Sequence, residues 1–211
     1  MKALIRLVRP FLTGLLFPSL LITSTTMNAA PESTNAPSRT ESVVIGGGCF
    51  WCMEAVFQRV DGVIKVTSGF AGGQAPKPSY EEVCTGRTGH AEVIKIEFNP
   101  AHVTLEHLLD VFWAAHDPTT LNRQGADTGT QYRSIILYAN DRQKAVAEKA
   151  KAAAAKEFST PVVTEIVPLK EFYSAEEYHQ NYYNDNKNQG YCQIVITPKL
   201  RKLINEKLIK E

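Results

Sequence analysis

Several motifs that mark large enzyme classes are missing from this sequence of 211 residues. It contains no G-x-G-x-x-G or P-loop glycine pattern for binding nucleotides, no H-E-x-x-H zinc motif and no G-x-S-x-G nucleophile turn. It has only four cysteines, and only one pair of them has C-x-x-C spacing. A four-cysteine zinc site needs a second such pair, so we expect no metal in this protein.

An excess of charge of one sign is missing as well. The chain has 23 Lys and Arg residues against 22 Asp and Glu residues. Residues 1–30 hold three basic and no acidic residues, so without them the balance is 20 against 22. No basic stripe is left that could release counterions from a nucleic acid, so we expect no DNA or RNA partner.

A run of apolar residues near the amino terminus is too short to span a membrane as a helix. The run covers Phe11–Ile22, follows three basic residues, and precedes a stretch of small and polar residues. This layout predicts a signal peptide over residues 1–30 and export, to the periplasm, with a retained membrane anchor as the alternative. Residues 31–41 are polar and contain proline, which predicts a flexible linker before a single catalytic domain over residues 42–211.

The order of predicted elements in this domain mixes helices and strands without strict alternation. Runs of β-branched and aromatic residues predict strands at Val43–Ile45, Val63–Phe70, Glu92–Phe98, Arg133–Ala139 and Val162–Val167. Helices are predicted after Cys49, after a cap at Thr104, over Asp141–Phe158, after a capping box from Ser174 to Glu177, and over Lys199–Ile209. We therefore predict an α+β, two-layer domain in which helices pack on a mixed or mostly antiparallel sheet.

The most informative stretch of the sequence is VVIGGGCFWCMEAVF, which covers Val43–Phe57. It has the pattern of a strand, a glycine turn and a helix, so Cys49 is placed at a helix start. The unpaired backbone N–H groups and the helix dipole favour a thiolate there, and the glycines keep bulk away from the sulfur. A buried structural cysteine is the alternative, but such a position does not need three glycines.

Glu92 is the most informative carboxylate. Alternation along the predicted strand AEVIKIEF puts it on the same face as Ile94, Ile96 and Phe98. Burial against that apolar face raises the pKa of a carboxyl group, which would make Glu92 a proton donor near neutral pH. In the alternative interpretation, Glu92 only ends the strand in water.

Other candidate residues lie in polar loops or beside Cys49. Tyr80, Tyr132 and Asp127 are in or next to such loops, where a phenol can donate a hydrogen bond to an oxygen atom of a substrate. Phe50 and Trp51 follow Cys49 directly, and they either form a wall of an apolar pocket or pack in the core.

Two other enzyme classes compete for the same residues. The spacing of Cys49 and Cys52 also occurs in thioredoxin-like thiol-disulfide oxidoreductases. His179 follows Cys49 by 130 residues, with Asn181 and Asn184 close behind, which is compatible with a papain-like cysteine hydrolase, although the local C-G-[SA]-C-[WY] signature is absent.

Seven stretches together resemble peptide methionine sulfoxide reductase A. They run through most of the domain, from about Val43 to Lys199, and several are long enough to be specific. The stretches are GGGCFWCMEAVF, GFAGG, SYEEVCTGRTGHAEV, HDPTT, DTGTQYRS, EEYHQNYY and GYC.

The resemblance implies a ferredoxin-like core with extensions and an activity that reduces the S epimer of methionine sulfoxide, free or in proteins. It implies no metal or flavin, a thioredoxin-like thiol donor as reductant, and no activity on the R epimer. We also expect the protein to be a monomer.

The resemblance also assigns roles. Cys49 matches the nucleophile that becomes a sulfenic acid, and Glu92 matches the acid that protonates the sulfoxide oxygen. His179 matches a supporting position. By the same match, Tyr80 and Tyr132 would donate hydrogen bonds to that oxygen, and Asp127 would help to position it. Phe50 and Trp51 would hold the substrate methyl group.

Two cysteines could resolve the sulfenic acid. Cys52 is closer in sequence to Cys49, but an attack from within one helix could require distorted disulfide geometry. Cys192 follows a polar stretch, Asn184–Gly190, which predicts a flexible loop that can move. We therefore predict a Cys49–Cys192 disulfide after one turnover, with Cys52 as the alternative resolving thiol.

Overall fold

The computed structural model describes residues 40–211. The predicted signal peptide and all but the last two residues of the predicted linker, up to residue 39, lie outside this part. The first strand begins at Glu41, one residue before the predicted start of the domain. Within residues 40–211, no helix has the length and apolar character needed to cross a membrane.

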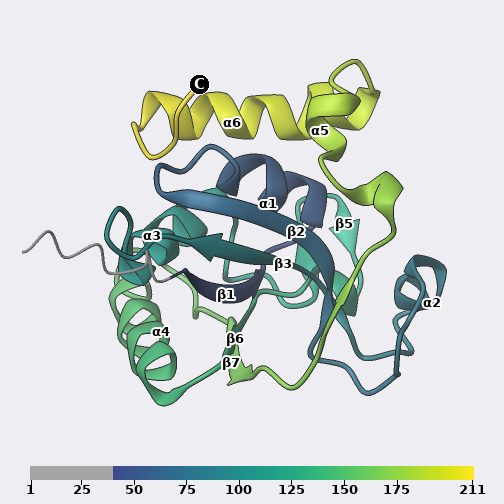
Figure 1. Cartoon of the computed structure of the whole chain (residues 1–211), viewed down its shortest axis with the longest axis horizontal. Helices are drawn as coiled ribbons and strands as arrows, with labels where there is room; N and C mark the ends of the chain where they lie inside the picture. Colours follow the sequence, from purple (N-terminus) through teal and green to yellow (C-terminus); the bar gives the residue numbers. More distant parts are fainter. Residues whose placement is uncertain (1–39) are drawn as a thin grey trace, which may run out of the picture. The chain divides into compact units, whose positions relative to one another are not determined.

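A six-stranded mixed sheet forms the centre of the domain (Figure 1). Its strands run in the order β7-β6-β1-β3-β2-β8, and every neighbouring pair is antiparallel except β6 and β7. The bounds are β1 Glu41–Gly46, β2 Val63–Ala71, β3 Ala91–Phe98, β6 Ile135–Tyr138, β7 Glu165–Pro168 and β8 Phe172–Ser174. The predicted α+β class with a mixed sheet is therefore confirmed.

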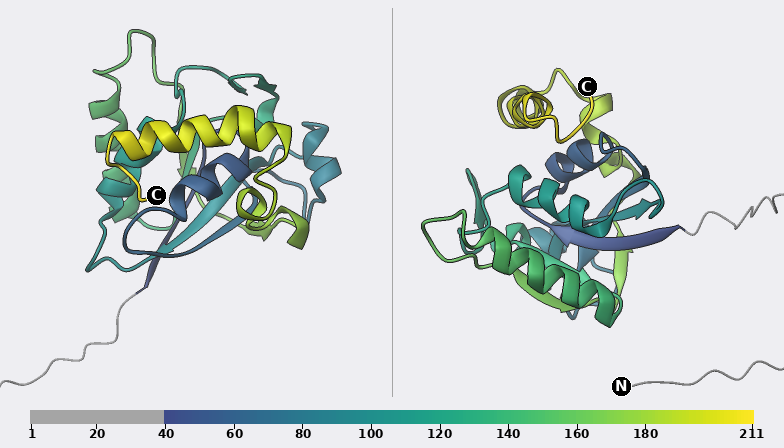
Figure 2. Two further views of the ribbon diagram at one scale, coloured as in Figure 1. Left: turned by 90° about the horizontal axis from the view of Figure 1, so that it is seen from above. Right: turned by 90° about the vertical axis from the view of Figure 1, so that its left-hand side faces the viewer.

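Helices cover one face of this sheet. Side chains alternate between the two faces along each strand, so neighbouring residues of a strand belong to different cores. In β1, Val43 and Ile45 join the larger core beneath the helices, whereas Val44 belongs to a smaller cluster on the other face. The helices are α1 Phe50–Phe57, α2 Tyr80–Cys84, α3 Leu105–Ala115, α4 Asp141–Ala154, α5 Tyr182–Asp185 and α6 Thr197–Asn205. Figure 2 shows α6 lying outside α1, so the carboxyl-terminal segment passes over the helix that follows Cys49.

Two predictions about elements were wrong. Ser174 does not cap a helix; it ends β8, and a short 3-10 turn at Glu177–His179 follows without a side-chain cap. A capping box is instead formed by Ser79 and Glu82 at the start of α2. The last helix does not begin at Lys199, because helical backbone runs from Gly190 and includes a π-helical segment, Cys192–Ile196.

The remaining elements were predicted with shifted ends. Thr104 caps α3 as predicted, whereas α4 ends at Ala154 instead of Phe158, and the two later strands are shorter or displaced.

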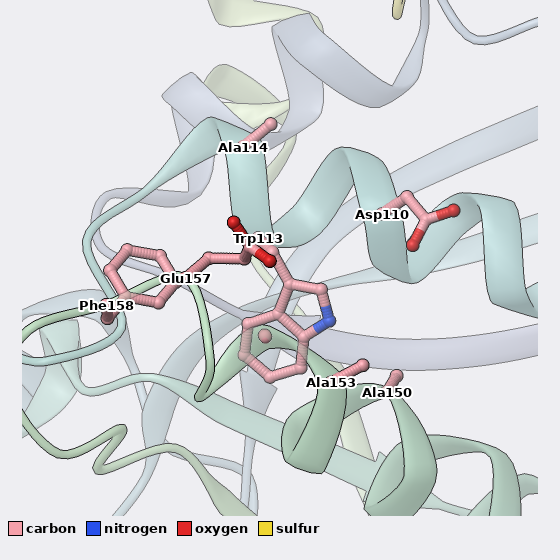
Figure 3. Close-up of a pocket in the computed structure, with 8 residues that line it drawn as sticks. Asp110, Trp113, Ala114, Ala150, Ala153, Glu157 and Phe158 are labelled. Carbon is pink, nitrogen blue, oxygen red and sulfur yellow. The ribbon is translucent and has the colours of Figure 1, made fainter.

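Between α3 and α4 lies a pocket of about 400 Å³, lined by Trp113, Phe158, two acidic residues and small side chains (Figure 3). None of the predicted site residues lines it, so the candidate site lies elsewhere.

Candidate functional site

The turn between β1 and α1 packs too closely for side chains. Gly48 has a φ of +94°, a conformation that favours glycine, and a Cβ atom on Gly46 would lie 2.6 Å from the carbonyl oxygen of Glu92. A Cβ atom on Gly47 would lie 2.9 Å from the ring of His116. The three glycines therefore bring the turn against β3 and α3, and Cys49 becomes the N-cap residue of α1 as predicted.

The thiols of Cys49 and Cys52 affect each other's pKa. Both are buried and line the same pocket. The neighbouring Cys49 thiol lowers the pKa of Cys52 to about 7, while burial raises the pKa of Cys49. Burial therefore opposes the predicted effect of the helix start on the Cys49 thiol, and the nucleophilic role of Cys49 stays a prediction.

Glu92 lies on the helix-covered face of β3 and is 1% exposed. Its Oε2 atom accepts a hydrogen bond from the backbone N–H of Phe50, the first residue of α1, at 3.0 Å. Burial nevertheless raises the pKa of Glu92 to about 8, so the carboxyl group carries a proton near neutral pH. The predicted rise in pKa is confirmed, and the alternative of a carboxylate in water is wrong.

Two tyrosines are placed near this carboxyl group. Tyr80 is the first residue of α2, and Tyr132 ends a 3-10 turn that begins at Thr130. Burial raises the pKa of both phenols above the ordinary tyrosine value. Both side chains therefore stay protonated and can act as hydrogen-bond donors beside Glu92.

Asp127 belongs to a two-stranded sheet made of β4, Arg123–Gln124, and β5, Asp127–Thr128. Its Oδ2 atom accepts a hydrogen bond from the phenol of Tyr191 at 2.7 Å, and the same phenol lies 3.6 Å from the sulfur of Cys52. These side chains and Cys49 line a pocket of about 300 Å³, closed on one side by the helical segment after Tyr191. The sequence analysis did not predict a role for Tyr191. Its position next to Cys192 in the GYC stretch was the signal that could have identified it.

Phe50 and Trp51 lie on another side of the first turn of α1. The ring of Phe50 is buried, with its centre 5.8 Å from that of Phe70 and 6.3 Å from that of Tyr80. The half-buried indole of Trp51 stacks on Tyr182, with the ring centres 3.7 Å apart and the planes at 7°. Both aromatics therefore pack, and Trp51 also keeps an exposed part.

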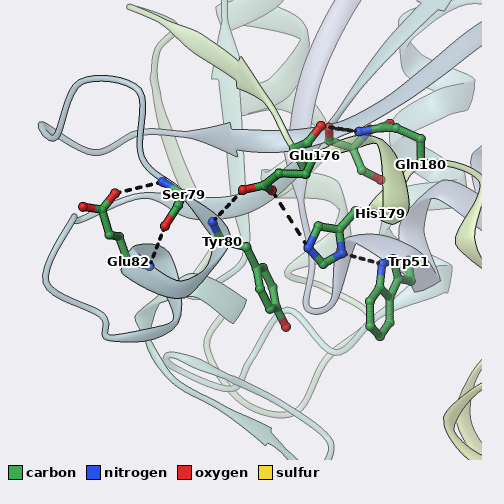
Figure 4. A network of polar contacts seen from close by, with 9 residues as sticks. Trp51, Ser79, Tyr80, Glu82, Glu176, His179 and Gln180 are labelled. Atoms are coloured by element: carbon green, nitrogen blue, oxygen red, sulfur yellow. Dashed lines mark hydrogen bonds and ion pairs between the residues drawn. The ribbon is translucent and has the colours of Figure 1, made fainter.

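His179 does not pair with Cys49. Its Nδ1 atom accepts a hydrogen bond from Trp51 Nε1 at 3.2 Å, as Figure 4 shows. The geometry of a cysteine hydrolase needs the imidazole as a base for the nucleophile. Because the described hydrogen bonds of this ring lead to Trp51, the site does not support that alternative.

Cys192 is buried in the helical segment before α6. The loop predicted over Asn184–Gly190 is shorter in the structure, because α5 includes Asn184 and Asp185 and helical backbone begins again at Gly190. Its predicted mobility stays a prediction. Burial raises the pKa of the Cys192 thiol, and the negative charge of Cys52 adds to the effect. All four cysteines are free, so the predicted Cys49–Cys192 disulfide stays a prediction.

Glu54 is a second buried carboxyl group that sequence reasoning missed. Burial raises its pKa to about 7, and its oxygens accept hydrogen bonds from the backbone N–H groups of Asn181 and Tyr182 at 2.9 and 3.3 Å. Glu54 therefore holds the start of α5, including Tyr182, which stacks on Trp51.

Among residues 40–211, no three His, Cys, Asp or Glu side chains gather as a metal site.

Comparisons with known proteins agree on one family. The family model described as "Peptide methionine sulfoxide reductase" matches residues 41–211. The peptide methionine sulfoxide reductase MsrA of Nitratiruptor sp. is 57% identical over 166 residues, which are 79% of this chain and 95% of that protein. Reduced Mxr1 from Saccharomyces cerevisiae is similar in structure, with a TM-score of 0.70 and 36% identity over 74% of this chain and 91% of the yeast chain. Mxr1 in complex with Trx2 matches with a TM-score of 0.51 and 25% identity, covering 69% and 86%.

Proposed function

This chain belongs to the peptide methionine sulfoxide reductase A family, and from that premise we propose a role in the reaction for each of its site residues. The enzyme reduces the S epimer of methionine sulfoxide in proteins to methionine. The observation that carries the proposal is Glu92, a buried carboxyl group that is protonated near neutral pH and hydrogen-bonded to the residue after Cys49.

The first step joins three of these groups. The sulfur of Cys49 attacks the sulfoxide sulfur while the thiolate of Cys52 takes up the thiol proton of Cys49. Glu92 delivers its proton to the sulfoxide oxygen, which then leaves the substrate sulfur and ends on Cys49. Methionine departs and Cys49 is left as a sulfenic acid, so one oxygen atom has moved from substrate to enzyme.

The remaining groups bind and orient the substrate. The protonated phenols of Tyr80 and Tyr132 donate hydrogen bonds to the sulfoxide oxygen, and Asp127 orients it. In the structure Asp127 accepts a hydrogen bond from Tyr191, so Tyr191 fixes this carboxylate. Phe50 and Trp51 provide the apolar wall for the substrate methyl group.

For the resolving step, we propose that Cys52 acts first. Its thiol lines the same pocket as Cys49, and Cys49 has non-helical backbone angles at the N-cap, so the expected distortion within one helix does not arise. Cys52 attacks the sulfenic acid, and a disulfide and water form. Cys192 then attacks the sulfur of Cys52, so a Cys52–Cys192 disulfide forms, the Cys49–Cys52 bond breaks and Cys49 leaves as a free thiol. Cys192 thus keeps a resolving role, but it acts second.

A thiol donor must finally reduce the enzyme disulfide. The yeast relative Mxr1 is known in complex with the thioredoxin Trx2. We propose a thioredoxin-like dithiol as the reductant of this chain, and such a donor returns the enzyme to its free-thiol state without a metal or flavin.

Three further expectations stay proposals. The order β6-β1-β3-β2, with α1 after β1 and α3 after β3, supports a ferredoxin-like core. Free methionine sulfoxide is proposed as a second substrate, and a monomer as the active form.

Export is proposed from residues 1–30 alone. The pattern of basic residues followed by an apolar run supports it. Cell fractionation checks this proposal: the processed protein is expected in the periplasm, and processed protein in the cytoplasm would contradict it.

The function itself is tested by incubating the protein with dithiothreitol and racemic methionine sulfoxide, followed by separation of the epimers. The S epimer is expected to disappear while the R epimer stays. Equal loss of both epimers, or of neither, would contradict the assignment. Reduction of a disulfide substrate at a higher rate than the sulfoxide would favour a thiol-disulfide oxidoreductase.

A further inference from the structure

A chain of polar contacts links the proposed methyl-binding wall to the proposed oxygen-binding tyrosine through Glu176 and His179 (Figure 4). The resemblance gave His179 only an unspecified supporting position, and it gave Glu176 no role. Trp51 Nε1 donates a hydrogen bond to His179 Nδ1 at 3.2 Å. Glu176 Oε1 accepts a hydrogen bond from the backbone N–H of Tyr80 at 3.2 Å. Glu176 and His179 are three residues apart, so one short segment holds both Trp51 and Tyr80.

The first of these bonds fixes the proton on the imidazole. An indole N–H can only donate, so Nδ1 of His179 must be the acceptor, and the neutral ring must carry its proton on Nε2. Protonation of the ring would place a hydrogen atom on Nδ1 as well. The indole N–H would then face another N–H, and the bond would be lost.

The surroundings make this ring a well-placed switch. It is 1% exposed, and its centre lies 4.3 Å from that of Tyr80, 5.1 Å from Phe50 and 5.6 Å from Trp51. Its Nε2 atom lies 4.0 Å from Glu176 Oε2, and neither atom has a hydrogen-bond partner within residues 40–211.

We propose that His179 is a positioning residue whose neutral ring holds the Trp51 indole against the substrate methyl group, and whose protonation releases the indole and weakens substrate binding. This inference rests on the role proposed above for Trp51. It adds a pH dependence that acts on substrate affinity and is separate from the chemistry of the thiols and Glu92.

Several titratable groups face the ring. The carboxylates of Glu176 and Glu81 favour the protonated form, and the rings of Tyr80 and Tyr178 contact the imidazole at tilted angles of 51° and 42° without adding a positive charge. Burial opposes them and is the larger effect, so the pKa of His179 lies below the ordinary histidine value. The neutral, indole-binding form therefore dominates at neutral pH, and the switch operates on the acidic side.

Two variants separate the hydrogen bond from the ring. His179→Asn keeps an acceptor near the position of Nδ1 but does not titrate, whereas His179→Phe keeps an aromatic ring but has no acceptor. With a methionine S-sulfoxide peptide and dithiothreitol, we expect the KM of His179→Phe to rise roughly 3- to 10-fold at pH 7.5, the range for one lost buried hydrogen bond. We expect kcat to change by less than about twofold, because the bond contributes to binding only.

The pH dependence is the sharper readout. The KM of the wild-type enzyme should rise by a similar factor on acidification, that of His179→Asn should stay level, and that of His179→Phe should be high throughout. A KM of His179→Phe equal to that of wild type, or an acid rise retained in His179→Asn, would overturn the proposal. In a Trp51→Phe background, which lacks the indole N–H, His179→Phe should add no further effect.

A spectroscopic measurement tests the same contact without turnover. The chain has two tryptophans, so Trp113→Phe leaves Trp51 as the only fluorophore of its kind. Its emission should change with pH on the acidic side, and the change should vanish when His179→Asn is added. An unchanged pH profile after that addition would contradict the proposal even if the sulfoxide reductase activity is confirmed. A wild-type enzyme without that activity would instead remove the proposed function, while the emission would still report the contact.

Discussion

Two sides of the first turn of α1 differ in how they are built. On the thiol side, Cys49 and Cys52 line one pocket, and Tyr191 links Cys52 to Asp127. On the aromatic side, Trp51 is held by stacking on Tyr182 and by one neutral hydrogen bond. In the proposed mechanism, groups on the thiol side change charge or bonding during the reaction, whereas groups on the aromatic side only hold the substrate.

This difference predicts effects of different size and kind. Changes on the thiol side, or at Glu92, remove transition-state interactions and should lower kcat by orders of magnitude. Changes on the aromatic side remove binding interactions and should raise KM by no more than about tenfold.

The largest effect is expected for Cys49→Ser. A serine hydroxyl offers almost no nucleophilic anion at neutral pH, so turnover of S-sulfoxide should fall at least roughly 10⁴-fold. Trp51→Phe, on the other side of the same turn, should keep most of kcat and raise KM. Steady-state kinetics of both variants with one peptide substrate make this comparison. A Cys49→Ser enzyme that still turns over would contradict the assignment of the chemistry to the thiol side.

Next in size is Glu92→Gln. The amide keeps the shape but cannot deliver a proton, so kcat should fall by roughly 10²- to 10⁴-fold. Glu54→Gln is the matched control, because Glu54 is also buried and also has a raised pKa, yet its hydrogen bonds come from Asn181 and Tyr182 and not from the residue after Cys49. Its kcat should stay within a few-fold of wild type, and its thermal midpoint should report any loss of stability. Equal losses of kcat in both variants would show that burial of a carboxyl group, and not proton donation, is what matters.

The resolving thiols give a third test. Cys192→Ser should still release about one methionine per enzyme and stop as a Cys49–Cys52 disulfide that thioredoxin reduces slowly. Cys52→Ser should release one methionine more slowly, because the base for the Cys49 proton is lost, and should then accumulate the sulfenic acid. Mass spectrometry of non-reduced digests identifies the joined peptides. A Cys49–Cys192 disulfide in wild type that forms as fast in Cys52→Ser would restore the direct attack predicted from sequence.

A smaller effect is expected from pH. The thiol pair must carry a negative charge, so kcat/KM should rise as pH increases through about 7, the pKa of Cys52. Glu92 must keep its proton, so kcat/KM should fall again as pH increases through about 8. The profile is therefore a narrow bell whose limbs change about tenfold per pH unit. Glu92→Gln should lose the falling limb, and a falling limb retained in that variant would contradict the assignment.

Sequence patterns predicted the features that local rules control. The glycine turn, the helix after Cys49 and the burial of Glu92 all follow from short-range periodicity. Each was then found in the structure.

Features set by packing between distant segments were missed. The helical position of Cys192 was hidden by the polar residues before it, and the bond between Trp51 and His179 joins positions 128 apart. The pKa of the Cys49 thiol depends on how deeply the thiol is buried, which the sequence does not give. Tertiary burial thus opposes the effect that had been predicted from the helix dipole alone.

The central claim, that Cys49 accepts the substrate oxygen, is tested most directly in the Cys52→Ser/Cys192→Ser double variant. One equivalent of a peptide containing S-methionine sulfoxide is added, a sulfenic-acid trap such as dimedone follows, and the tryptic peptides are analysed by mass spectrometry. If Cys49 accepts the oxygen, about one methionine is released per enzyme and the trap is attached to Cys49 alone. A trap on Cys84, or methionine released with no modified cysteine, would contradict it.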